Sequence, residues 1–127
     1  MPLGYLALVL HAHLPYVRHV DRDDCLEERW LYEALTESYV PLLDTFLRLA
    51  DDRVPFCLTV SLSPPLLNML LDPLLQTRYL NHLARMMELA DKEVFRTRHQ
   101  PAFAPLARMY RDRLRRVCHL YHEVYRD

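Results

Sequence analysis

The sequence predicts an α/β fold that begins with two parallel strands and continues as helices. Three observations support this prediction: a continuous apolar run at 5–10, a β-prone run at 56–62 between Pro55 and Pro64, and an apolar stripe of helical period over 26–50. A strand, a helix and a second buried strand form a βαβ unit, which is right-handed in almost all proteins and carries helices on its sheet.

The helical stretch at 26–50 repeats apolar residues at three- and four-residue steps, from Trp30 to Leu47. Trp30 fits this stripe, so core packing is the main interpretation of this side chain. Pro41 lies inside the stripe and lacks an N–H group, so we expect it to kink or split the helix.

The part of the sequence after the second strand shows no third strand. A proline pair starting at Pro64 can open a short helix, and Asp72 followed by Pro73 is typical of an N-cap with proline at the first helical position. Further helices are expected near 73–97 and 104–126. Because two parallel strands leave both sheet edges open, the sequence indicates one part of a larger structure.

Composition excludes several classes of function. Sixteen basic and seventeen acidic residues give a net charge of -1, so no overall field favours nucleic acid or a membrane. The single glycine excludes glycine-rich phosphate loops. Three cysteines at wide spacings indicate free thiols and a cytoplasmic location. The apolar run at 5–10 is too short for export or for spanning a membrane.

The last helix carries five arginines, yet this pattern favours a solvated helix face over a nucleic-acid patch. Asp112 lies four residues from both Arg108 and Arg116, and residues at that helical spacing can form ion pairs. Asp112 can therefore pair with either of these two arginines.

His11 and His13 end the first apolar run, in LVLHAHLPY. Residues two apart on a strand point to the same side, so both imidazoles are expected at the carboxyl end of the strand, where α/β folds bind ligands. Ordinary polarity at a strand end and a metal site are two interpretations. A metal needs more ligands, and the other histidines are scattered along the chain: His19, His82, His99, His119 and His122. We therefore expect no metal and no cofactor.

Three ordered blocks resemble glycoside hydrolase family 57, most closely its α-1,4-glucan branching enzymes. These blocks are GYLALVLHAHLPYVRH, LEERWLYEALTESYVPLLDTFLRL and FCLTVSLSPPLL, and the likeness continues more weakly through the helices. The resemblance implies that 1–127 are the N-terminal part of a catalytic domain, an incomplete parallel (β/α) barrel. It also implies an α-glucan substrate, glycogen or amylose-like, and retaining glycosyl transfer through a covalent intermediate.

The resemblance assigns roles to a few residues. His11 and His13 match histidines that line the donor-sugar subsite, and Pro15 shapes the following loop. Leu14 stands where glutamine is commoner in the family. Trp30 is a lesser candidate for a sugar-stacking face.

The two carboxylate signatures of the family do not occur in these 127 residues. The acidic cluster before the first helix is assigned to capping and solubility: Asp21, Asp23, Asp24, Glu27 and Glu28. The chain alone is therefore expected to be inactive, either as a truncated product or as part of a split enzyme completed by a downstream polypeptide. A non-catalytic, partner-dependent module and a metal-dependent hydrolase built on His11 and His13 are the alternatives.

Overall fold

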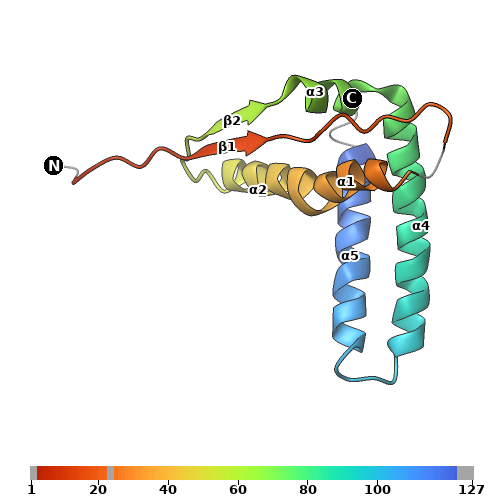
Figure 1. Ribbon diagram of the computed structural model, residues 1–127. Coiled ribbons are helices and arrows are strands. Elements are labelled where there is room, and N and C mark those ends of the chain that lie inside the picture. Colours follow the sequence, from red (N-terminus) through yellow and green to blue (C-terminus); the bar gives the residue numbers. More distant parts are fainter. Residues whose placement is uncertain (1–2, 23–24, 123–127) are drawn as a thin grey trace.

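The computed structural model describes residues 3–22 and 25–122. Its elements in chain order are β1 (Val9–Ala12), α1 (Leu26–Ala34), the π-helical turn η1 (Leu35–Tyr39), α2 (Val40–Asp51), β2 (Thr59–Leu62), α3 (Pro64–Leu71), α4 (Pro73–Thr97) and α5 (Ala104–Leu120). The strands lie side by side with α1 and α2 along one side, while α4 and α5 form a long projecting hairpin (Figure 1). The predicted α/β fold of two parallel strands followed by helices is confirmed.

The sheet is shorter than the sequence predicts. β1 and β2 pair in parallel, with His11 opposite Ser61. β1 covers Val9–Ala12 and not 5–10, and β2 covers Thr59–Leu62 and not 56–62. An apolar run forms a ladder only where a neighbouring strand is present, and within the described residues each strand has one neighbour.

Pro41 splits the helical stretch, as predicted. Because proline has no N–H to donate, the backbone passes through η1 and α2 restarts with Pro41 in its first turn. Thr36 on η1 shares a buried hydrogen bond of 3.0 Å with the Tyr79 hydroxyl on α4. The interruption therefore also joins the first helical stretch to the hairpin.

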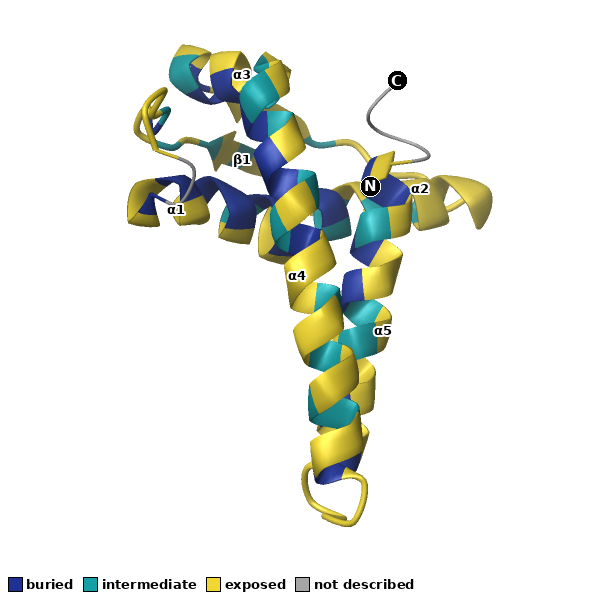
Figure 2. Ribbon diagram, turned by 90° about the vertical axis from the view of Figure 1, so that its right-hand side faces the viewer, coloured by how far each residue is buried: buried dark blue, intermediate teal, exposed yellow. Residues whose placement is uncertain are grey.

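The core lies where α1, α3, α4 and α5 meet, and we call this region the helical hub. Its most buried apolar side chains are at most 1% exposed: Leu31, Leu66, Met69, Leu75, Tyr79 and Leu83. The distal half of the hairpin is largely exposed (Figure 2). Trp30 is 48% exposed, so its predicted core position is wrong. The buried side of α1 is instead set by Leu31 and Tyr32, and Trp30 lies beside it.

Asp72 caps α4, as predicted. Its Oδ1 accepts hydrogen bonds from the N–H groups of Leu74 (2.8 Å) and Leu75 (3.3 Å), and its Oδ2 pairs with Arg18 Nε. Burial opposes the ionised form, but the hydrogen bonds from Leu75, Leu74 and Arg18 outweigh it and lower the pKa of Asp72. The cap thereby holds the loop after β1 against the start of α4.

Charged side chains cover the outer faces of the long helices. Arg116 pairs with Asp44 on α2 at 2.6 Å, and Asp112 pairs with its neighbour Arg111 at 2.8 Å. Asp112 thus pairs with Arg111, and the carboxylate that reaches Arg116 comes from another helix. None of the described helices combines the length and apolarity needed to cross a membrane.

Candidate functional site at the carboxyl end of the sheet

His11 and His13 lie together at the carboxyl end of β1. Their rings are stacked, with centroids 5.8 Å apart and an interplanar angle of 12°. Both side chains are exposed. The two-residue spacing therefore places both imidazoles on one side of the chain, as expected for extended backbone.

Ser61 on β2 completes this polar group, and the sequence analysis did not single it out. Its Oγ lies 2.6 Å from Nδ1 of His11, the residue opposite it in the parallel register. This hydrogen bond orients the His11 ring and directs Nε2 away from β2, where it can donate or accept according to its tautomer. The signal that could have found Ser61 is its position next to the last residue of the β-prone run at 56–62.

The two faces of the sheet differ in chemistry. Side chains alternate between faces along a strand, so one face carries Val9, His11, Thr59 and Ser61. The other face carries Leu10, Ala12, Val60 and Leu62, which line a largely apolar cleft of about 640 Å³ with Leu43 and Phe46 of α2. His11 also borders this cleft. The histidine face is thus opposite the crossover helix, which corresponds to the interior side of a (β/α) barrel.

Ser63 adds a buried hydroxyl at the same edge. It follows β2, occupies the N-cap of α3 and is 7% exposed. Its Oγ has no hydrogen-bond partner among the described residues. A buried hydroxyl in this state can bond a ligand or a water molecule.

The other residues to which the resemblance drew attention are Leu14, Pro15 and Trp30. Pro15 is exposed in the loop after β1, and Leu14 packs partly against the core. Trp30 is on α1 and, within the described part of the chain, makes no ring contact with His11 or His13.

Glu28 is not a solvent-facing capping residue, so that assignment is wrong. It is 1% exposed, and its Oε1 accepts hydrogen bonds from Arg78 Nη1 (2.7 Å) and from the backbone N–H of His19 (3.0 Å). Its Oε2 accepts from the Tyr32 hydroxyl (3.0 Å). Burial and then the hydrogen bond to Glu28 raise the pKa of Tyr32, so the phenol remains a donor. Sequence could not reveal this role, because Arg78 is fifty residues away along the chain.

Within residues 3–22 and 25–122, the remaining acidic residues and histidines that the sequence singled out form no second group around His11. Asp21 and Glu27 are exposed, and Asp23 and Asp24 lie outside the described residues. His82 is half-buried with its ring 5.2 Å from that of Tyr32, and His99, His119 and His122 are exposed.

Parallel strands with polar side chains at their carboxyl ends, joined by a helical crossover, are the arrangement found in α/β barrel proteins. The chain belongs to glycosyl hydrolase family 57, whose family model matches residues 7–123. It is similar to the 1,4-α-glucan branching enzyme of Thermococcus kodakarensis, with 35% identity over 91 residues, 72% of this chain and 13% of that protein. A probable 1,4-α-glucan branching enzyme of Mycobacterium tuberculosis is 39% identical over 70 residues, 55% of this chain and 13% of that protein.

Two solved structures share the fold. The α-amylase AmyC from Thermotoga maritima superposes with a TM-score of 0.84 at 44% identity, covering 91% of this chain and 22% of that one. The family 57 branching enzyme from Pyrococcus horikoshii gives a TM-score of 0.87 at 28% identity, covering 95% of this chain and 22% of that one. The chain thus spans 13% of the length of the curated relatives it matches.

Proposed function

We propose that this chain is the N-terminal segment of an α-glucan-active family 57 enzyme whose reaction is 1,4-α-glucan branching. One observation supports this most directly: the stacked His11 and His13 rings, with His11 held by Ser61, lie at the carboxyl end of a parallel sheet. That is the end of the strands where barrel enzymes bind their substrates. The named activities of the relatives from Thermococcus and Pyrococcus support the choice of reaction.

In this proposal His11 and His13 bind and orient the donor sugar. Imidazole nitrogens can donate hydrogen bonds to sugar hydroxyls or accept them, and two stacked rings present such groups side by side. Ser61 fixes the orientation of one ring. These groups position substrate and leave the bond chemistry to carboxylates.

The catalytic carboxylates come from outside these 127 residues. Retaining transfer needs a nucleophile and an acid/base about 5 Å apart. The nucleophile attacks the anomeric carbon while the acid protonates the departing 4-oxygen, which gives a glycosyl-enzyme. The 6-hydroxyl of an acceptor glucan then displaces the enzyme carboxylate and yields its proton to the base. Glu28, the most buried carboxylate among the described residues, accepts hydrogen bonds from Arg78 and Tyr32 and is therefore assigned no catalytic role.

The rest of the barrel would cover the exposed strands. Val9 is 63%, Val60 44% and Leu62 51% exposed, although all three lie on strands that a closed barrel buries. A continuation of the chain or a separate polypeptide can supply this cover. The free thiols Cys25, Cys57 and Cys118 favour a cytoplasmic location, where glycogen is an accessible substrate.

Hydrolysis is the second candidate reaction, because AmyC, with 44% identity, is named an α-amylase. Branching and hydrolysis share the glycosyl intermediate and differ in whether a glucan hydroxyl or water attacks it. Branching lowers the iodine staining of amylose without increasing reducing ends, whereas hydrolysis increases them.

A chimera tests the proposal. The chain replaces the matching N-terminal segment of the Pyrococcus branching enzyme, and the product is incubated with amylose. We expect branching by the chimera and neither reaction by the isolated chain. His11→Ala should lower kcat/KM of the chimera about 10- to 100-fold. The sugar hydroxyl that His11 binds would lose its partner inside the closed site, and an unpaired buried polar group costs about 1–3 kcal/mol. His99→Ala, which alters an exposed residue between α4 and α5, is the matched control.

Other outcomes favour the alternatives. A folded but inactive chimera supports a non-catalytic module. One zinc per chain in elemental analysis, lost with His11→Ala, supports the metal-dependent hydrolase. Activity of the isolated chain that disappears when one of its own carboxylates is substituted would show that the chemistry lies within it.

A further inference from the structure

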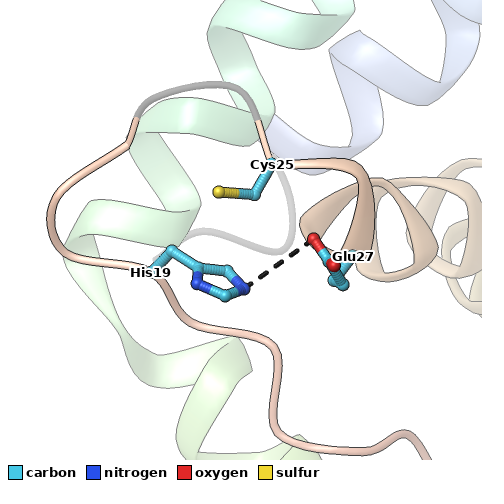
Figure 3. Close-up of side chains that lie close together, drawn as sticks. All are labelled: His19, Cys25 and Glu27. Carbon is cyan, nitrogen blue, oxygen red and sulfur yellow. Dashed lines mark ion pairs between the residues drawn. The ribbon is translucent and has the colours of Figure 1, made fainter.

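A second group of side chains that could bind a metal lies at the start of α1, and the proposed glucan binding does not involve it. His19, Cys25 and Glu27 each place one ligand atom so that the three atoms lie within 4.8 Å of one another (Figure 3). Nε2 of His19 and Oε2 of Glu27 lie 3.9 Å apart. Imidazole nitrogen, thiolate sulfur and carboxylate oxygen are the three kinds of ligand that zinc takes in proteins.

We propose that His19, Cys25 and Glu27 form a divalent metal site selective for zinc, with water in the fourth position. This site is separate from the pair formed by His11 and His13. Its role would be to fasten the loop after β1 to the first turn of α1.

The backbone that carries these ligands is already fixed. The N–H of His19 donates to Glu28 Oε1 at 3.0 Å, and the carbonyl of His19 accepts from Arg78 Nη1 at 2.6 Å. Glu28 belongs to the first turn of α1, next to Glu27 and three residues after Cys25. The buried Glu28–Arg78 pair therefore holds His19 against the turn that supplies the other two ligands. Supporting interactions of this kind determine how well ligands are oriented in metal sites.

Cys25 is the least expected residue in this position. It is 8% exposed and occupies the N-cap of α1, yet its side chain makes no capping hydrogen bond. Its sulfur reaches the carbonyl of Arg22 only at 4.0 Å. A buried cysteine is often a small hydrophobic residue, but this sulfur lies within 4.8 Å of an imidazole nitrogen and a carboxylate oxygen.

The geometry requires a modest closure. A tetrahedral zinc with bonds of about 2.0–2.3 Å holds its ligand atoms about 3.3–3.7 Å apart. The side chains of His19 and Glu27 are 45% and 50% exposed, so both can rotate toward the sulfur without repacking the core. The thiolate and the carboxylate balance the charge of the ion, whereas the nearby Arg22 opposes it.

Binding is written as Zn²⁺ plus the neutral Cys25 thiol giving the zinc thiolate and one proton released to solvent. Burial, and then the Glu28 and Glu27 carboxylates, raise the pKa of Cys25, so the thiol is protonated before the metal enters. No electrons are transferred, and no other reactant is required.

Cobalt titration of the 127-residue chain tests the site, because Co²⁺ substitutes for zinc and gives an intense near-ultraviolet band when bound to thiolate. We expect one equivalent of Co²⁺, displaced by one equivalent of Zn²⁺. Cys25→Ser should abolish the band and weaken binding at least about 100-fold. His19→Ala and Glu27→Gln should each weaken it at least about tenfold, by analogy with the 10- to 100-fold effects of losing supporting groups.

Matched controls use a thiol and an imidazole outside the cluster. Cys57→Ser removes an exposed cysteine and His99→Ala an exposed histidine, and neither should change the titration. A band that Cys57→Ser removes, or that His19→Ala and Glu27→Gln leave unchanged, overturns the proposal. So does a chain with helical circular dichroism that shows no stoichiometric band. Glucan activity plays no part in the readout, so this test and that of the proposed function fail independently.

Discussion

The helical hub and the two-stranded sheet are parts of one small chain, but their side chains are covered to very different extents. In the hub, Leu66, Tyr79 and Leu83 are 0% exposed. On the sheet, Val9 is 63% and Leu62 is 51% exposed. The hub therefore holds most of the stability that this chain can generate by itself, whereas the sheet, which carries the candidate site, depends on additional structure.

Polar interactions strengthen the same contrast. In the hub, Glu28 and Arg78 form a buried ion pair at 2.7 Å, and Thr36 bonds Tyr79 at 3.0 Å. On the sheet, by contrast, the side-chain hydrogen bond between His11 and Ser61 is exposed. Buried polar groups lose much when they lose a partner, and exposed ones lose little because water replaces it.

The largest effect on stability is expected from breaking the buried ion pair. Arg78→Met keeps most of the apolar stem but leaves the Glu28 carboxylate buried without its cation. We expect a loss of about 3–5 kcal/mol in the free energy of unfolding, which is enough to unfold a marginal domain. Urea unfolding followed by helical circular dichroism measures it.

An exposed ion pair provides the control. Arg115 and Asp91 lie 3.0 Å apart with side chains 55% and 52% exposed, so Arg115→Ala should cost at most about 1 kcal/mol. The double change Glu28→Leu with Arg78→Met should recover much of the loss, since no unpaired charge remains. Equal effects of Arg78→Met and Arg115→Ala would contradict the importance assigned to the buried pair.

A matched pair of leucines compares the two regions directly. Leu66 on α3 is 0% exposed and Leu62 on β2 is 51% exposed, and the two are four residues apart. In the isolated chain, Leu66→Ala should lower the free energy of unfolding by about 2–5 kcal/mol, and Leu62→Ala by no more than about 0.5 kcal/mol. In the chimera the cost of Leu62→Ala should rise if the barrel covers this strand. An unchanged cost there would count against that cover.

The features that sequence predicts well depend on local chemistry. Proline without an N–H explains why Pro41 interrupts the helix, and a carboxylate before Pro73 explains the cap formed by Asp72. The HxH spacing likewise brings His11 and His13 to one side of the strand end. Each of these outcomes is determined by neighbours within a few residues.

The features that sequence could not predict depend on distant partners. Glu28 has the sequence position of a carboxylate at a helix start, but Arg78 of α4 contacts it and makes it part of a buried ion pair. Ser61 gained its position beside His11 from the strand register, which no single run of residues specifies. Trp30 fitted an apolar stripe but lies beside the buried side of α1, because the actual neighbours of a helix decide which side is covered.

A smaller effect is expected at Asp72, where the loop after β1 meets the hub. Asp72→Ala removes the cap of α4 and the partner of Arg18, so we expect a loss of about 1–2 kcal/mol near pH 7. The pKa of Asp72 is lowered in the folded chain, so its contribution is complete above the unfolded pKa of about 3.9 and is lost as pH falls through the folded value.

Unfolding measured between pH 7 and pH 3 checks this dependence on pH. The difference between the wild-type chain and Asp72→Ala should shrink as the solution becomes acidic. Asp72→Asn keeps a capping oxygen but carries no charge, so its stability relative to Asp72→Ala should change little with pH. A difference between wild type and Asp72→Ala that grows in acid would contradict the assigned pKa direction.

The smallest effect is expected at the exposed sheet, from Ser61. In the chimera, Ser61→Ala should lower kcat/KM about 3- to 10-fold, since one hydrogen bond contributes about 0.5–1.5 kcal/mol, and Ser61→Thr should restore most of the activity. Because Ser61 acts by orienting His11 through the 2.6 Å contact, adding Ser61→Ala to His11→Ala should cause almost no further loss. Additive losses would instead mean that Ser61 contacts the glucan itself, which would make the edge of β2 part of the sugar subsite rather than its support.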